Sequence, residues 1–227
     1  MDKEESKDKA KELALATIRG LISWIPGAGG LMSEWFGQVV ASPIAKRRDE
    51  WVRSIEERVR AIEKDDPRFS AENLKNNKIF ATAVLAATQV ALRNHQEEKI
   101  AALRNGVINS VTSDIEEDKK LMFFNVIDLL TPTHLKILRF FDNPNAWLGK
   151  SETPLPKFLM AGHEALLEYA LPEFRGQGEF YNQILKELHA HGLTSTPAIH
   201  NVVASAGFFH SITTLFGKEF LKFVEEK

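Results

Sequence analysis

The 227-residue sequence contains no cysteine, and this absence excludes several kinds of chemistry. Without cysteine the chain forms no disulfide, holds no thiolate nucleophile and offers no thiolate ligand to a metal. Proteins of reducing compartments need no disulfides, so the composition suits a cytoplasmic protein.

The chain also lacks a long apolar run of the kind that a signal peptide or a membrane span requires. Its first twelve residues, MDKEESKDKAKE, are charged where a signal peptide would be apolar. The longest uncharged stretch of the N-terminal region, Gly20–Ser33, contains Pro26 and a cluster of glycines. It is too short to cross a bilayer as a helix, and we expect a cytoplasmic location.

Positive charge is not in excess anywhere that a nucleic-acid binder would need it. The formal net charge is −2; the acidic excess lies in residues 121–227, whereas the first 120 residues are balanced. Because affinity for the phosphate backbone comes from clustered lysine and arginine, we expect weak nucleic-acid binding at best.

No catalytic motif is present, and the histidines are poorly spaced for a metal. His189 and His191 are two residues apart on a predicted helix and therefore point to different faces. A hairpin could bring His200 near His210, but a metal site needs three or four converging ligands. We predict a non-enzymatic protein without metal, cofactor or small-molecule substrate.

What is present is helical periodicity, so the chain is predicted to be mainly α-helical, with at most one short sheet in the last 30 or so residues. The clearest helix follows Thr131, a good N-cap, with Pro132 at its first position. Asn143-Pro144 ends it, because proline disfavours the helical conformation of the preceding residue.

Before this helix, the spacing predicts long helices over residues 42–64, from a Ser70 cap to about 94, and over 96–111. The first should bury one stripe of apolar residues: Ile44, Trp51, Ile55, Val59 and Ile62. The helix predicted over residues 96–111 carries three polar residues, Arg104, Asn105 and Asn109. They could belong to a functional site, although such residues more often cap neighbouring helix ends or face water.

After Pro144, a helix over residues 179–191 should stop at Gly192. Residues 198–204 and 208–213 are compatible with strands and form a candidate hairpin. Thr213 or Thr214 precedes a last helix, whose predicted apolar face is Leu215, Phe216, Phe220, Leu221 and Val224.

Residues 13–41 are predicted to form an apolar helical hairpin with a tight corner at Pro26–Gly30. The glycine spacing does not fit a phosphate-binding loop, and no strand precedes it. Trp24, Trp35 and Phe36 either pack against protein or anchor at a membrane surface, where tryptophan is favoured. Arg19 and Glu34 are costly in hydrocarbon, which favours protein contact.

Lys46, Arg47 and Arg48 form a short basic run that could meet phosphate or anionic lipid. The simpler interpretation is a solvated helix face on which they pair with Asp49 and Glu50. They are candidate interaction residues, together with Trp24, Trp35 and Phe36.

Residues 121–227 resemble a winged-helix domain. The resemblance lies in the order of helices, in KELHAHGLTS (186–195), in the candidate hairpin after it and in TTLFGKEFLKF (213–223). It implies that the third helix, GEFYNQILKELHAH, would enter the major groove of DNA. Lys186 is its only lysine or arginine, against Glu179 and Glu187. Tyr181, Asn182 and Gln183 could touch bases, but few groups could hold phosphate, so contact with a protein is favoured.

The N-terminal half, with its apolar hairpin and Lys-Arg-Arg helix, resembles uncharacterised bacterial helical proteins of the abortive-infection type. This resemblance implies a bacterial cytoplasmic protein with a role in phage defence and assigns no residue roles.

Together these features predict a helical domain (1–115) and a winged-helix-like domain (116–227) that act as a protein-interaction or regulatory module. A protein partner or self-association is expected, with Tyr181 and Lys186 as further contact residues. The alternatives are a membrane-active effector that inserts residues 13–41 and a nucleic-acid-binding regulator.

Overall fold

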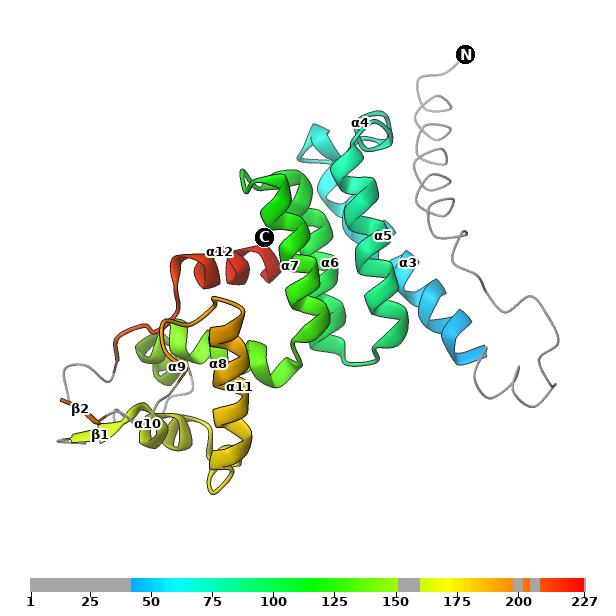
Figure 1. Ribbon diagram of the computed structural model, residues 1–227. Coiled ribbons are helices and arrows are strands. Elements are labelled where there is room, and N and C mark those ends of the chain that lie inside the picture. The colour runs from blue at the N-terminus through cyan, green and yellow to red at the C-terminus, as the bar shows by residue number, and fades with distance from the viewer. Residues whose placement is uncertain (1–41, 151–159, 198–201, 205–208, 227) are drawn as a thin grey trace, which may run out of the picture. The chain divides into compact units, whose positions relative to one another are not determined.

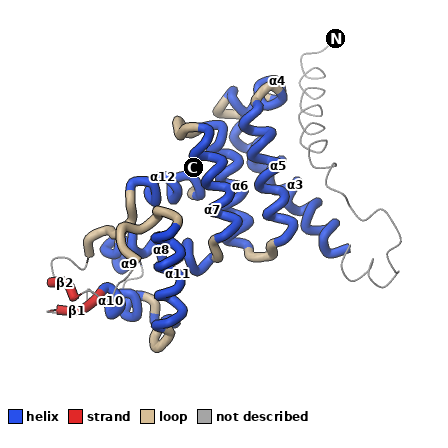
Figure 2. The backbone as a smooth tube through the Cα atoms, viewed as in Figure 1, coloured by secondary structure: helices blue, strands red, loops and turns tan. Residues whose placement is uncertain are grey.

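The protein is mainly α-helical, as predicted. A computed structural model describes residues 42–150, 160–197, 202–204 and 209–226. In the described part of the chain, two short strands are the only departure from helices, turns and loops (Figures 1 and 2). The apolar hairpin predicted for residues 13–41 lies outside the described residues.

The chain divides into two compact units. The first comprises residues up to Leu129 together with Phe223–Lys227, and the second comprises Leu130–Lys222. The division therefore falls later than residue 115, and the last five residues of the chain return to the first unit.

The first unit is built from helices of unequal length. In chain order they are α3 (Ser42–Glu63), the 3₁₀ turn η2 (Pro67–Phe69), α4 (Ala71–Lys75), α5 (Lys78–Arg93), α6 (Glu97–Thr112) and α7 (Glu117–Leu129). Helices α5 and α6 lie side by side, joined by a short corner at residues 94–96 (Figure 1).

The buried stripe of α3 is shorter than predicted. Trp51, Ile55 and Val59 are buried, but Ile62 is only half-buried and Ile44 is 41% exposed. Ile44 shares the helical spacing of the core residues, but it lies in the first turn of α3, where the described part of the unit does not cover it.

The helix predicted from Ser70 to about residue 94 is two helices. Ser70 caps α4, as expected, through its hydroxyl and the backbone N–H of Asn73. The chain then breaks at Asn76 and Asn77, and the Asn77 side chain accepts a hydrogen bond from the Phe80 N–H at 2.9 Å. Asparagine favours a cap because its short side chain satisfies a free N–H of the first turn.

Two asparagines of α6 hold the end of the last helix. The Asn105 Nδ2 donates to the Val224 carbonyl at 3.0 Å, and the Asn109 Nδ2 donates to the carbonyls of Phe223 and Glu225, each at 2.9 Å. The interpretation of these residues as caps of a neighbouring helix end is confirmed. The last carbonyls of a helix have no partner within it, so these amides satisfy groups that would otherwise be buried unpaired.

Gly106 lies between the two asparagines, where a side chain would not fit without displacement. A Cβ atom there would lie 3.0 Å from the Phe223 ring and 3.1 Å from the Phe124 ring. These two rings pack edge to face with their centroids 5.4 Å apart. The glycine thus lets the aromatic pair approach the α6 backbone.

The second unit contains shorter elements. They are α8 (Pro132–Asp142), α9 (Pro144–Lys150), β1 (Met160–Gly162), α10 (His163–Ala170), the 3₁₀ turn η3 (Pro172–Phe174), α11 (Gly178–Ala190), β2 (Val202–Ala204) and α12 (Leu215–Val224), whose last two residues belong to the first unit.

Both predicted ends of α8 are confirmed. Thr131 is the N-cap, Pro132 is the first residue and Asn143 is the C-cap. The stop predicted at Gly192 is also confirmed, because this residue follows α11 with a φ of 72°, which glycine adopts without strain.

The sheet differs from the expected one. Strand β2 pairs antiparallel with β1, Met160 opposite Ala204, so one strand lies well before the last 30 residues. The expected hairpin between 198–204 and 208–213 is not seen; residues 198–201 and 205–208 lie outside the described residues. A single bridge joins Thr194 to Thr213. Pairing between strands distant in sequence leaves no signature in local composition, which explains the difference.

Helix α12 begins on a tight contact with the chain after α11. The Thr214 Oγ1 accepts from the Gly217 N–H at 2.9 Å and donates to the Gly192 carbonyl at 2.6 Å. Phe220, Leu221 and Val224 are buried as predicted. Leu215 is 83% exposed, because it lies nine positions before Val224 and therefore on the opposite side of the helix.

We expect Gly217→Ala to destabilise the second unit by about 3 kcal/mol, as overpacking does where backbone must shift. Its Cβ would lie 2.3 Å from the Leu193 carbonyl oxygen and 2.7 Å from the Thr213 Cγ2. The free energy of unfolding in urea measures the effect.

Gly149→Ala is the matched control, because a Cβ added at Gly149 in α9 meets no atom within 4 Å beyond its chain neighbours and the backbone of its own helix. It should be neutral or gain up to about 1 kcal/mol from helix propensity. Equal stability of the two variants would contradict the close contact at Gly217.

Candidate functional site

The first unit carries a surface groove of about 550 Å³ between α3 and α6, with the end of α5 at one side. Residues at spacings of three and four on both helices line it. They are Arg47, Glu50, Trp51 and Ser54 of α3; Ala91, Asn94 and His95 at the end of α5 and after it; and Glu97, Ile100, Ala101 and Arg104 of α6.

The floor of the groove is apolar and firmly held. Trp51 is 3% exposed, and its Nε1 donates to the Thr88 Oγ1 at 2.8 Å. The Thr88 hydroxyl in turn donates to the Val84 carbonyl at 2.6 Å, so the indole is held by a buried chain of hydrogen bonds. Ile100 and Ala101 remain half-buried and offer apolar surface to a ligand or partner.

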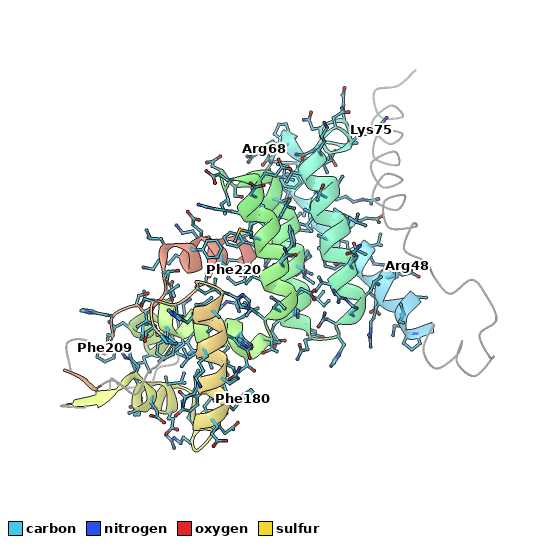
Figure 3. All side chains as sticks on the ribbon, viewed as in Figure 1. Arg48, Arg68, Lys75, Phe180, Phe209 and Phe220 are labelled. Carbon is cyan, nitrogen blue, oxygen red and sulfur yellow. The ribbon has the colours of Figure 1, made fainter. Side chains whose placement is uncertain are left out.

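The basic run of α3 is divided between two environments. Lys46 forms an ion pair with Glu50 at 3.7 Å, and Arg48 pairs with Asp49 at 3.2 Å. The interpretation of a solvated face is therefore confirmed for Lys46 and Arg48, and Figure 3 shows Arg48 on this helix. Arg47 instead lines the groove.

Two guanidinium groups of the groove are uncompensated within the described chain. Arg47 and Arg104 are half-buried, and neither forms a hydrogen bond or ion pair with another described residue. Arg104 has no acidic residue three or four positions away on α6. A half-buried guanidinium without a carboxylate favours an anionic group in the groove.

Two buried lysines, by contrast, have structural roles. The Lys99 Nζ donates to the Asp128 carbonyl at 2.6 Å, and the Lys120 Nζ donates to the Ser113 carbonyl at 2.9 Å. Burial lowers the pKa of both amines. Each ammonium satisfies a carbonyl near a helix end, which is where cations are favourable.

In the second unit, Tyr181 is a core residue. Its side chain is fully buried, and its hydroxyl donates to Glu164 and, at 3.2 Å, to Glu168. Burial and these two carboxylates raise the pKa of the phenol. Tyr181 therefore presents no side chain to a partner. The spacing of Tyr181 with Ile184, Leu185 and Leu188 in the sequence could have placed it on the apolar face.

The outward face of α11 is nearly neutral and partly apolar. Its exposed residues are Glu179, Phe180, Gln183, Lys186, His189 and Ala190. Phe180 is 50% exposed in the first turn of the helix (Figure 3). Lys186, a predicted contact residue, is exposed on this face. Phe180 was not predicted, although its position outside the spacing of the buried residues could have indicated it.

His134 joins α8 to α11. Its Nδ1 accepts from the Thr131 backbone N–H at 3.2 Å and lies 2.8 Å from the Thr131 Oγ1. Its Nε2 lies 2.9 Å from the Glu187 Oε2. Hydrogen bonds from Gln183 and His134 hold the pKa of Glu187 below its ordinary value. The contact between Thr131 and His134 is that of a capping box, so helix capping accounts for the contact on the Nδ1 side of the ring.

His163 is the other buried histidine, at the first position of α10. Its ring packs edge-on against Phe141 at a centroid distance of 6.1 Å, and its buried Nε2 has no hydrogen-bond partner in the described chain. Burial and the neighbouring His210 lower its pKa.

The remaining predicted residues and groups are placed as follows. Trp24, Trp35 and Phe36 lie outside the described residues, as does His200. No cluster of three or more histidine, aspartate or glutamate residues suitable for a metal occurs in the described ranges. That the protein needs no metal stays a prediction.

Comparison with known proteins gives no match: no family model, curated protein or solved structure matches the chain. Among the helices that the structure describes, none is by itself long and apolar enough to cross a membrane; α7 and α8 taken together pass that test of length and composition.

We expect the protein to lose stability as the pH falls below about 6.5, and His163 to contribute to that loss. Its folded-state pKa lies below the ordinary value of 6.5, so the unfolded chain binds the proton more readily. The contribution of the neutral ring is complete above that pH and is lost below it. Free energies of unfolding between pH 8 and 5 should therefore fall more steeply for the native chain than for His163→Leu.

His95→Leu, which removes an exposed histidine, is the control for this measurement. Parallel pH profiles of the native chain and His163→Leu would contradict a depressed pKa at His163.

Proposed function

We propose that this protein is a non-enzymatic protein-interaction or regulatory module that contacts its partner through the outward face of α11. The observation that carries the proposal is the exposure of Phe180 on a nearly neutral surface. Aromatic residues are enriched in protein interfaces, whereas charged residues are depleted at their centres.

The arrangement of the second unit supports a winged-helix-like domain. Its elements follow the order α8, α9, β1, α10, η3, α11, β2 and α12, and β1 pairs antiparallel with β2. The Thr194–Thr213 bridge holds together the two ends of the segment between α11 and α12. With the seven-residue helix α9 left aside, α11 takes the place of the third helix of such a domain.

The charge of that helix favours a protein over DNA as its partner. On the exposed face, Lys186 is balanced by Glu179, and Gln183 bonds to Glu187 at 2.8 Å. A helix that docks on DNA needs several cations around it to hold phosphates, and one lysine supplies little of this attraction.

The setting that we propose is bacterial phage defence, which rests on the resemblance of the N-terminal half to abortive-infection-type proteins. A membrane-active effector and a nucleic-acid-binding regulator are the competing proposals, and the same experiment distinguishes them.

The test places a photo-crosslinking residue at Gln183 and identifies the molecules captured in the native host. We expect one protein partner, lost in Phe180→Asp, because a charge would be buried at the centre of the interface. Leu215→Asp is the matched control, since it also adds a charge at an exposed apolar residue of this unit.

Circular dichroism verifies that both variants remain folded. Capture that is equal in Phe180→Asp and Leu215→Asp would contradict the assigned surface. Tight binding of duplex DNA at physiological salt would favour the nucleic-acid regulator, and strong flotation with anionic vesicles would favour the membrane effector.

A further inference from the structure

The groove between α3 and α6 is unfilled in the described chain, although its chemistry is that of a contact surface. Half-buried Ile100 and Ala101 lie between two arginines, Arg47 and Arg104, that pair with no described residue. An occupant that suits this surface is apolar and carries at least one carboxylate or other anion.

The undescribed N-terminal chain joins the fold close to this groove. Helix α3 begins at Ser42, and Arg47, which lines the groove, follows five residues later. The turns of α3 that line the groove, from Arg47 to Ser54, extend about 10 Å at the helical rise. The eleven residues 31–41 cover about 16 Å as a helix, so this segment is long enough to lie along the groove.

The composition of residues 31–41, LMSEWFGQVVA, matches the groove. Glu34 is the only charged residue between Gly20 and Ala41. Six of the eleven residues are large and apolar: Leu31, Met32, Trp35, Phe36, Val39 and Val40. A lone carboxylate among apolar residues complements unpaired guanidinium groups beside an apolar floor.

We propose that residues 31–41 dock into this groove of the same chain. Their apolar side chains cover Ile100 and Ala101, and the Glu34 carboxylate pairs with the Arg104 guanidinium. Seven residues lie between Glu34 and Ser42, so the two are eight helical steps, about 12 Å, apart. Folded back along α3, this length reaches the turns of α3 that carry Arg47 and Glu50, and α6, which carries Arg104, forms the facing wall of the groove. The inference is independent of the function proposed for α11.

The absence of cysteine makes proximity directly measurable, because two introduced thiols are the only ones present. Ser33→Cys with Ser54→Cys places one thiol beside Glu34 and the other in the groove, and leaves the proposed ion pair intact. We expect a short bismaleimide to link them within one chain, detected as a cross-linked peptide by mass spectrometry.

Ser33→Cys with Lys75→Cys is the control pair, since Lys75 lies exposed on α4, outside the groove (Figure 3). Equal cross-linking of the two pairs overturns the proposal. A product of dimer mass at low protein concentration also overturns it, because a second copy would then be the occupant.

Charge exchange tests the ion pair. In the Ser33→Cys, Ser54→Cys background, Glu34→Arg or Arg104→Glu alone should lower the cross-linking rate about fivefold, and the two together should restore it. Single exchanges without effect, or a double exchange without recovery, overturn the assignment of Glu34 to Arg104. Anionic vesicles test the competing membrane interpretation. If the cross-link between positions 33 and 54 is lost when the vesicles are added, and the chain floats with them, then lipid binds residues 31–41 in preference to the groove. That result overturns stable docking.

Discussion

The first unit depends on hydrogen bonds between two asparagine amides of α6 and the carbonyls that end the chain's last helix. Asn105 and Asn109 bind the carbonyls of Val224, Phe223 and Glu225, which no residue of α12 itself can satisfy. Because a buried unpaired carbonyl costs about 1–3 kcal/mol, these bonds decide whether the C-terminal residues can pack beneath α6. The chain that leaves the unit after α7 is thereby brought back to it, and the whole second unit is an insertion between two segments of the first.

Features set by neighbouring residues were predictable from the sequence, whereas those set by distant ones were not. The ends of α8 and the stop at Gly192 follow from side chains and backbone angles within a few positions. Exposure of Leu215 was also predictable, because Leu215 lies nine positions before Val224 and therefore on the opposite side of α12. Exposure of Ile44 depends on which other elements reach it, and its helical spacing alone contains no such information. The pairing of β1 with β2 is of the same kind, because it joins segments about forty residues apart.

The residues of the candidate surfaces also differ in whether neighbouring or distant parts of the chain determine their contacts. Pairing of Lys46 and Arg48 with their acidic neighbours on α3 was predictable from spacing. The position of Arg104 opposite Arg47 depends on the packing of α6 beside α3, so their shared groove appears only in three dimensions. Tyr181 was predicted to be a contact residue, but it lies on the apolar face of α11, where its side chain is buried.

The most direct test of this account is the free energy of unfolding of Asn109→Ala compared with that of Asn125→Ala. Asn125 is exposed on α7, so its replacement should change the stability by less than about 0.5 kcal/mol. Asn109→Ala leaves two C-terminal carbonyls without their amide donor and should cost about 2–3 kcal/mol. Equal stability of the two variants would contradict the claim that α6 holds the end of α12 and so completes the first unit.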